Sequence, residues 1–521
     1  MEELREIKFD IPQEFNLAQH LVDRNISAGR GDKVAIYFKD QQLTYNDLAS
    51  QVNRAGNTFL NLGVEMENRV ALILLDAPPF FACFLGAIKM GAIPIPISTM
   101  LRSQDYEYVL NDSRARVLVI DEPLLSEVGP VLGKLRSLRN VVVVGRPPQG
   151  CLSYQDLMDR ASDHLEPAPT SKDDQAFWQY SSGSTGFPKG AVHLQHDAIY
   201  CCETYYKYIL GINSEDRVFS AAKLFFAYGL GNSLYAPLNV GASVVLYDGR
   251  PLPEKMFEVI DRYKPTIFFG VPTLYASMLA IKDAEKRYDT SSLRLCVSAG
   301  EALPAEFFNQ WRERFGTEIL DGMGTTEICH IFISNRPGEV RPGSTGKAVP
   351  GYEIKLVDEE GKEVKEGEIG DLMVRGDSIA AFYWNKHDRT KATFYGPWIK
   401  TGDKMYRDEE GYYWYCGRSD DMLKVGGIWV SPVEVENTLV GHPAVLEAAV
   451  VGALDEEGLI KPKAFVVLKE GYEPGPALEE ELKKFVKDRI APYKYPRWIE
   501  FVPELPKTAT GKMQRFRLRG G

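Results

Sequence analysis

Residues 180–190 read Tyr180-Ser181-Ser182-Gly183-Ser184-Thr185-Gly186-Phe187-Pro188-Lys189-Gly190 and predict a loop that binds a polyphosphate. Glycines allow backbone N–H groups to approach an anion closely, and Ser and Thr hydroxyls add uncharged donors. Lys189 adds a positive charge. The loop is not a Walker A loop, because no Gly-Lys-Ser/Thr follows its first glycine at the required spacing.

A polar surface loop or a glycine-rich hairpin turn would have a similar composition. The flanking residues favour phosphate binding, because 174–180 and 190–194 are apolar segments that predict a strand on each side of the loop. The chain is therefore expected to place the loop between two strands.

Outward from this loop, strands and helices alternate on both sides. Residues 34–145 contain Val- and Ile-rich runs separated by helical stretches, with a proline-limited edge strand at 92–97 and a helix at 80–90. Residues 174–325 repeat the pattern, with a helix at 253–263. Near-continuous apolar strands that alternate with helices are typical of doubly wound, mostly parallel sheets, so we expect two α/β subdomains.

The pattern changes after about residue 343. Residues 353–358 and 370–375 predict antiparallel strands of a small β-barrel, and a compact α+β segment with a helix at 477–488 follows Asp420. The predicted fold class is α/β, with an N-terminal domain over 1–419 that contains both subdomains and the barrel. A smaller C-terminal α+β domain is predicted over 420–521.

Composition limits the partners and the compartment. A net charge of −11 over 521 residues argues against nucleic acid as a general partner. The seven cysteines are scattered and form no Cys-x-x-Cys pair, which favours a reducing, cytoplasmic setting without disulfides. No signal peptide is visible at the N-terminus, and charged and proline residues interrupt the most apolar region, 70–97, which argues against a membrane partner. The sequence leaves open whether the protein is a monomer or a homodimer.

A second motif, Asp321-Gly322-Met323-Gly324-Thr325-Thr326-Glu327, follows an apolar strand. Glu327 suits Mg²⁺, which takes few protein ligands and relies otherwise on phosphates and water. A helix N-terminus with an acidic residue is an equally good interpretation of this motif by itself.

Two further motifs are each weak evidence for a function when considered alone. In Thr401-Gly402-Asp403 a carboxylate on a glycine turn is placed to accept ribose hydroxyls, although the sequence is also a good turn. In the loop 506–513, Lys512 is a cation with flexible flanks, suited to a developing negative charge, although most such lysines are solvated surface charges.

Together with residues 415–421, these motifs occur in an order that resembles the adenylate-forming superfamily of acyl-CoA synthetases, luciferases and nonribosomal adenylation domains. The resemblance covers nearly the whole chain. It implies that the β,γ-phosphates of ATP are held by Ser181, Ser182, Gly183, Ser184, Thr185, Gly186 and Lys189. It places Gly300, Glu301, Ala302 and Asp321 at the adenine, and Asp403 and Arg418 at the ribose.

The same resemblance implies the catalytic groups. Thr326 would contact the α-phosphate, Glu327 would bind Mg²⁺, and Lys512 would bridge the carboxylate and the α-phosphate during adenylation. The C-terminal domain would rotate about a hinge at Asp420 for the second step, in which Gly426 and Gly427 leave room for the pantetheine arm of CoA. An ordinary hairpin turn is the alternative interpretation of those two glycines.

The acid is constrained by the pocket motifs. Residues 223–231 contain no carboxylate to pair a substrate ammonium, so an amino acid is disfavoured. Residues 223–231 and 327–335 resemble the benzoate-CoA ligase branch. The resemblance implies a flat aryl pocket lined by Ala227, Tyr228, Ala299, Gly324, His330 and Ile331.

The sequence therefore predicts an ATP- and Mg²⁺-dependent ligase that activates benzoate as its adenylate and transfers it to CoA. The same chemistry on a hydroxybenzoate, an alicyclic acid or a short branched acid is the closest alternative. A noncatalytic nucleotide-binding scaffold and a luciferase-type oxygenase are alternatives of other classes.

Overall fold

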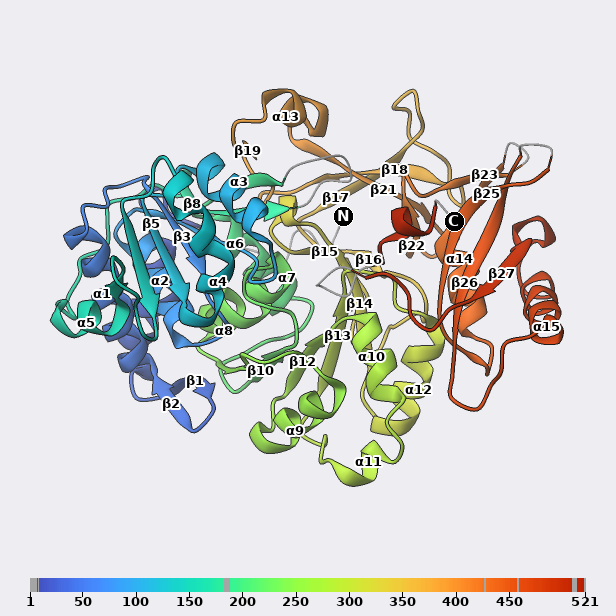
Figure 1. Ribbon diagram of the computed structural model, residues 1–521, viewed down its shortest axis with the longest axis horizontal. Helices are drawn as coiled ribbons and strands as arrows, with labels where there is room; N and C mark the ends of the chain where they lie inside the picture. The colour runs from blue at the N-terminus through green and yellow to red at the C-terminus, as the bar shows by residue number, and fades with distance from the viewer. Residues whose placement is uncertain are drawn as a thin grey trace.

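The N-terminal Val- and Ile-rich runs build a five-stranded parallel sheet, drawn in blue to blue-green in Figure 1. The computed structural model describes residues 7, 9–181, 188–425, 428–456, 459–507 and 513–519. The strand order is β4 (Ile93–Pro96), β3 (Arg69–Ile73), β5 (Val117–Asp121), β6 (Asn140–Val144) and β7 (Leu152–Ser153). β4 lies at the edge, as its prolines predict.

Helices cover both faces of this sheet, because successive side chains of its strands point in opposite directions. Val70 and Leu72 join the core that contains α1 (Tyr45–Asn61) and α2 (Pro78–Lys89). Ala71 and Ile73 join a second core, with α3 (Ser103–Ser113). The shorter helices here are α4 (Leu125–Val128) and α5 (Tyr154–Arg160). The doubly wound arrangement predicted for this region is confirmed.

A nine-stranded sheet forms the second subdomain. Its order is β16 (Lys347–Ala348), β15 (Ile331–Ser334), β14 (Ile319–Gly324), β13 (Leu295–Ala299), β12 (Ile267–Gly270), β10 (Arg217–Ser220), β11 (Ser243–Leu246), β1 (Val34–Phe38) and β2 (Gln41–Thr44). Its helices are α6 (Asp197–Cys201), α7 (Ala227–Leu230), α8 (Ala236–Val240), α9 (Pro253–Tyr263), α10 (Pro272–Leu279), α11 (Ala284–Arg287) and α12 (Ala305–Phe315). The limits of α9 are those predicted from sequence.

One assignment was wrong. The sequence pattern predicts that residues 34–44 belong to the first subdomain, but β1 pairs in parallel with β11, with Ile36 opposite Val244. The hairpin β1–β2 therefore extends the second sheet. Local sequence predicts that a segment forms a strand. The strand with which it pairs depends on contacts with residues more than two hundred positions away.

The strands around the predicted phosphate loop form a small sheet of their own. β8 (Gln175–Ser181) and β9 (Lys189–Leu194) are antiparallel, with Ser181 opposite Lys189, and β19 (Phe382–Tyr383) pairs with the outer side of β9. This hairpin brings both ends of the loop to one place and adds Tyr383 beside them.

The antiparallel strands predicted near residues 353–375 are present, and Figure 1 draws them at the top centre, to the right of the first α/β subdomain and above the second. β17 (Glu353–Val357), β18 (Gly370–Arg375), β21 (Trp398–Arg407) and β20 (Phe394–Tyr395) follow one another, and β22 (Tyr413–Arg418) pairs with β21. The helix α13 (His387–Thr393) leads into β20.

Residues beyond 420, drawn in red in Figure 1, form separate hydrophobic cores. Their elements are β23 (Leu423–Val425), β24 (Ile428–Val430), α14 (Pro432–Val440), β25 (Val445–Leu454), β26 (Ile460–Leu468), α15 (Pro476–Lys487) and β27 (Trp498–Phe501). Phe307 of α12 packs against the larger of these cores. The domain boundary at Asp420 stays a prediction.

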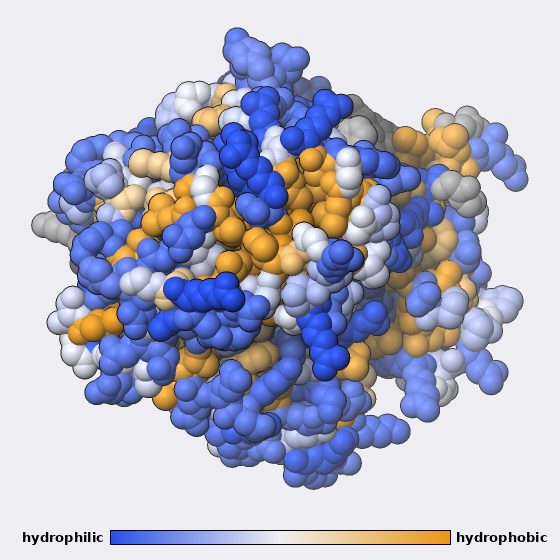
Figure 2. Space-filling view, turned by 60° about the vertical axis from the view of Figure 1, so that its left-hand side comes forward, coloured by the Kyte–Doolittle hydropathy of each residue, from blue (hydrophilic) through white to orange (hydrophobic). Residues whose placement is uncertain are grey.

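The surface is mixed in polarity. Figure 2 shows a hydrophobic area near the centre of one face, surrounded by hydrophilic residues. Within the described ranges, none of the helices has both the length and the apolar character needed to cross a membrane.

Candidate active site

Glu327 is the centre of a polar cluster at the ends of three elements. A 3-10 turn, Thr326–Ile328, follows β14 and presents the Glu327 side chain. Its Oε1 lies 3.1 Å from Lys189 Nζ at the start of β9. Ser181 Oγ, at the end of β8, donates to the same oxygen at 3.3 Å. The residues on both sides of the predicted phosphate loop thus converge on the predicted magnesium ligand.

Tyr383 completes this cluster, and sequence reasoning missed it. Its hydroxyl donates to Glu327 Oε1 at 2.8 Å and accepts a hydrogen bond from Lys189 Nζ at 2.6 Å. The Lys189 ammonium also lies 4.0 Å from the centre of the Tyr383 ring, a cation–π contact. The local sequence around Tyr383 does not indicate a site residue, because its partner Lys189 on β9 lies almost two hundred residues earlier in the chain.

The surroundings keep Glu327 ionised. Burial alone would raise its pKa, but the Lys189 ammonium and the Tyr383 hydroxyl together lower that pKa below its ordinary value. Burial and the neighbouring Glu327 carboxylate raise the pKa of Tyr383, so its hydroxyl keeps its proton. The side chain of Glu327 is 14% exposed, which leaves it accessible to a small cation.

The predicted ribose residues face each other across β21 and β22. Asp403 and Arg418 are register partners, and Arg418 Nη1 lies 3.3 Å from Asp403 Oδ1. Tyr415 donates its hydroxyl to the same carboxylate oxygen at 3.3 Å. Burial raises the pKa of Asp403, and Arg418 opposes that effect. The glycine turn expected at Thr401-Gly402-Asp403 is wrong, because these residues lie within β21; Gly402 nevertheless has φ of +80°, a left-handed conformation that glycine adopts readily.

The predicted adenine residues meet where the loop after β13 lies against Asp321, which is inside β14. Gly300 has φ of +97°, which turns the chain into Glu301 and Ala302. Leu303 donates its N–H to Asp321 Oδ2 at 3.4 Å, so the 300–303 loop lies against Asp321. Asp321 is 4% exposed, and burial raises its pKa well above the ordinary range. Its other oxygen, Oδ1, has no hydrogen-bond partner among the described residues.

The predicted acyl pocket is partly assembled. Tyr228 stacks on His330 with ring centres 5.6 Å apart, and Ile331 pairs with Gly324 across β15 and β14. A Cβ on Gly324 would lie 2.6 Å from the His330 carbonyl oxygen, so this close approach requires glycine. Ala299 lies in the same core as Ile331, and Ala227 begins α7 one residue before Tyr228.

His330 is polar but neutral. Burial lowers its pKa to about 3, and 2% of the residue is exposed. Nε2 lies 2.6 Å from the Tyr206 hydroxyl, which donates to Asn232 Oδ1. Nε2 therefore carries the proton and donates it to the Tyr206 oxygen, leaving Nδ1 as an acceptor without a partner among the described residues. Tyr206 and Asn232 were also missed from sequence.

Several predicted residues lie outside the described part of the chain. These are Ser182, Gly183, Ser184, Thr185, Gly186, Gly426, Gly427 and Lys512. Met513, the residue after Lys512, donates its N–H to Glu301 Oε1 at 2.7 Å. Asp420, the predicted hinge, is exposed, and its carbonyl accepts a hydrogen bond from Arg519 at 3.0 Å.

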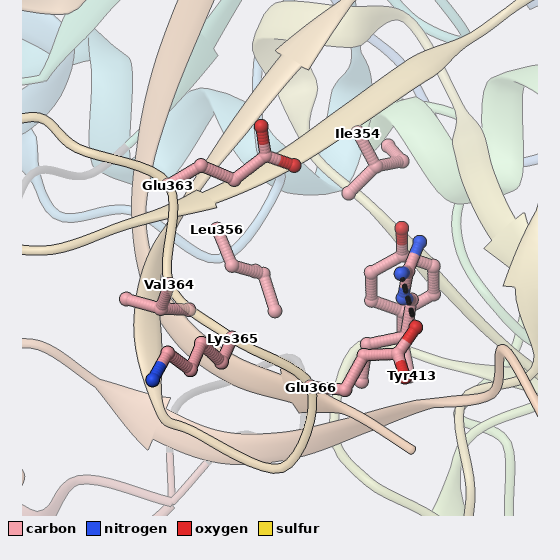
Figure 3. Close-up of a pocket in the computed structure, with 8 residues that line it drawn as sticks. Ile354, Leu356, Glu363, Val364, Lys365, Glu366 and Tyr413 are labelled. Atoms are coloured by element: carbon pink, nitrogen blue, oxygen red, sulfur yellow. Dashed lines mark hydrogen bonds and ion pairs between the residues drawn. The ribbon is translucent and has the colours of Figure 1, made fainter. Parts of the chain in front are cut away.

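A separate surface cavity of about 470 Å³ lies on the antiparallel sheet (Figure 3). Ile354 and Leu356 of β17 form its apolar part, and Glu366 pairs with Arg407 across it at 2.7 Å. None of the residues that line this cavity belongs to the Glu327 cluster.

Comparison with known proteins agrees with this geometry. Residues 23–384 match the model of the AMP-binding enzyme family, and residues 434–512 match the AMP-binding enzyme C-terminal domain. The predicted boundary at Asp420 falls between the two matched segments.

Two curated relatives are similar over nearly their whole length. A benzoate–CoA ligase of Thauera aromatica is 54% identical over 98% of this chain and 96% of its own. A 4-hydroxybenzoate–CoA/benzoate–CoA ligase of Rhodopseudomonas palustris is 47% identical over 97% of this chain and 94% of its own.

Solved structures show the same similarity. An anthranilate CoA ligase in complex with anthranoyl-AMP has a TM-score of 0.95 at 47% identity, covering 98% of this chain and 97% of that one. A benzoate CoA ligase from Burkholderia xenovorans has a TM-score of 0.90 at 47% identity, covering 97% and 100%. The chain belongs to the AMP-binding enzyme family.

Proposed function

We propose that the protein is a benzoate–CoA ligase. It uses ATP and Mg²⁺ to convert benzoate into benzoyl-adenylate with release of pyrophosphate, and then transfers the benzoyl group to CoA with release of AMP. The observation that supports this most strongly is 54% identity to a benzoate–CoA ligase over 98% of the chain.

The chemistry explains why the chain needs these groups. A carboxylate is a poor acyl donor, because its leaving group would be oxide. Attack of a carboxylate oxygen on the α-phosphorus breaks the bond to the β-phosphate oxygen, and the resulting adenylate has a good leaving group. Positive charge near the α-phosphate offsets the charge that develops there.

The donor set fits Mg²⁺. Glu327 has an ionised hard oxygen that already faces one cation, Lys189, at 3.1 Å. No group of three or more metal-binding side chains gathers among the described residues. Bound Mg²⁺ would neutralise phosphate charge, with Glu327 as its protein ligand.

The other roles are proposed residue by residue. Ser181 and Lys189 would hold the β,γ-phosphates with the loop between them, and Thr326 would contact the α-phosphate. Asp403 and Arg418 would hold the ribose, and the 300–302 loop and Asp321 would border the adenine. Met513, the residue after Lys512, contacts Glu301 of the predicted adenine loop, and this contact supports the catalytic role proposed for Lys512.

The second step needs CoA. Rotation about Asp420 would withdraw Lys512 and bring Gly426 and Gly427 to the pantetheine arm. The scattered free thiols support a reducing, cytoplasmic location for the enzyme.

A ring-substituted acid is the second candidate. The relatives include a ligase for 4-hydroxybenzoate and benzoate and one for anthranilate. His330 Nδ1 lacks a partner among the described residues and is an acceptor, which suits a substrate with a hydroxyl or amino donor on the ring.

Pyrophosphate release across a panel of acids, with and without CoA, tests the proposal. Selective turnover of benzoate with AMP release that requires CoA is the expected result. Preference for 2-amino- or hydroxybenzoates would favour the second candidate. Nucleotide binding without turnover of any acid would favour a noncatalytic scaffold, and oxygen consumption would favour an oxygenase.

A further inference from the structure

A buried histidine lies directly behind the Glu327 cluster. His193 is on β9, four residues after Lys189, and its side chain is 0% exposed. Its Nε2 lies 2.8 Å from the carbonyl oxygen of Thr326, and its Nδ1 lies 2.8 Å from Asp197 Oδ2 at the start of α6. The Phe177 ring stacks on the imidazole with ring centres 5.1 Å apart and fixes its plane.

The partners of the imidazole determine where its protons are. A carbonyl oxygen only accepts, so Nε2 must carry a proton and donate it to Thr326. The other nitrogen, Nδ1, faces the Asp197 carboxylate, and this contact holds the ring with Nε2–H directed at Thr326. Asp197 also accepts the N–H of Leu194 at 3.1 Å, which fixes its position.

The Thr326–Ile328 turn depends on such external contacts. It has no side-chain cap, and each of its carbonyls accepts a hydrogen bond from elsewhere in the chain. His193 donates to Thr326 and the Ala380 N–H donates to Glu327, both at 2.8 Å, while the Ser378 hydroxyl donates to Ile328 at 2.9 Å.

The residue after the turn adds strain. Cys329 has φ of +69°, a region that residues with a side chain rarely adopt, so the local sequence does not favour this conformation by itself. Contacts from other elements must hold the turn in place.

β9 therefore holds the turn at two points. Lys189 contacts the Glu327 carboxylate, and His193 contacts the Thr326 backbone. Side chains four residues apart lie on the same face of a strand. β9 therefore fixes Glu327 and Thr326 together relative to the phosphate loop that precedes this strand.

We propose that His193, oriented by Asp197, is a positioning residue that sets Thr326 and Glu327 for the α-phosphate and Mg²⁺. This inference rests on the proposed roles of those two residues. It predicts that His193 matters for the adenylation step and for Mg²⁺-dependent ATP binding, and much less for thioester formation from adenylate that is already made.

A matched pair of variants isolates the hydrogen bond to Thr326. His193→Gln and His193→Met have side chains of similar length and shape, and both lose the Asp197 partner, but glutamine alone has an N–H that reaches the carbonyl. Tyr45→Phe is the control. It removes a fully buried donor to another backbone carbonyl, that of Ala242 at 2.7 Å, away from the site.

Three quantities are measured on each folded protein: the rate of pyrophosphate release with benzoate, the rate of thioester formation from supplied benzoyl-adenylate and CoA, and the affinity for ATP with and without Mg²⁺. We expect His193→Met to lose about tenfold or more in kcat/KM for ATP in adenylation, because one misdirected contact in the site has an effect of this order. Thioester formation should stay within about threefold, and His193→Gln should recover most of the loss.

Tyr45→Phe should lower the melting temperature without separating the two steps. Equal loss of both steps in His193→Met, or equal behaviour of the glutamine and methionine variants, would overturn the positioning role. Failure of the wild type to use benzoate would instead refute the proposed function. In that case, the ATP affinities of the wild type and the His193 variants, with and without Mg²⁺, would still test the role of His193.

Discussion

Gly324 is the position at which one added methyl group should disturb the acid pocket most directly. A Cβ there would lie 2.6 Å from the His330 carbonyl oxygen and 3.0 Å from the Ile331 nitrogen, and both of these atoms are backbone. Real Cβ atoms do not approach a neighbour to within 3.0 Å, so Gly324→Ala must separate β14 from residues 330–331 by at least about 0.4 Å.

This separation moves His330 and Ile331, which are predicted to form one wall of the pocket. Overpacking of this kind costs about 1–3 kcal/mol. Benzoate binding requires His330 and Ile331 in their original positions. The variant must therefore regain the unfavourable contact with the added Cβ when the acid binds. Since each 1.4 kcal/mol corresponds to a factor of ten, kcat/KM for benzoate should fall about 5- to 150-fold.

Gly322→Ala is a matched control on the same strand. Its Cβ would meet the ends of the flexible Ile331 side chain at 3.1 Å and the Ile333 carbonyl oxygen at 3.2 Å, so much smaller shifts suffice. Pyrophosphate release against benzoate concentration, with ATP affinity measured separately, gives both effects. Wild-type kcat/KM in Gly324→Ala, or an equal loss in Gly322→Ala, would refute the steric argument.

Three further predictions concern charge and the order of steps. Glu327→Gln keeps the shape of the side chain but removes its charge, so the rate of adenylation should fall about 10²- to 10³-fold at every Mg²⁺ concentration tested; a rate restored by excess Mg²⁺ would argue against direct coordination. Lys512→Ala should abolish pyrophosphate release yet form thioester from supplied benzoyl-adenylate, and Gly427→Trp should do the reverse; loss of both steps in either variant would contradict its assignment. Burial lowers the pKa of His330 from 6.5 to about 3, so the stability that the neutral imidazole provides is complete above pH 6.5 and declines as the pH falls toward 3. Relative to His330→Phe, the wild type should therefore lose about 2 kcal/mol between pH 7 and pH 5 in urea unfolding, and parallel losses in the two proteins would show that the imidazole is accessible to protons.

Much of the fold follows from local pattern. The helix at 253–263 has the limits predicted from its periodicity, and the strands on both sides of the phosphate loop are present. The hairpin at 34–44 was assigned to the wrong sheet, because strand propensity does not specify a partner and β1 pairs with β11 far along the chain.

The candidate site also contains residues that the sequence predicts and residues that only the structure reveals. Motif order predicts Glu327, Lys189 and Ser181 as site residues, and the structure brings all three side chains together. Tyr383 and His193 gave no sequence signal, since each reaches the Thr326–Glu327 turn across more than fifty residues of chain.

The sequence by itself determined the chemical groups of this protein and the local elements that present them, because glycine turns, hydroxyl-rich loops and strand periodicity depend on neighbours a few residues apart. The tertiary structure decided which groups act on one another. It ionises Glu327 beside Lys189, keeps His330 neutral with its proton on Nε2, and holds a strained turn in place through His193. These properties arise from burial and from contacts between distant segments, and neither is present until the chain has folded.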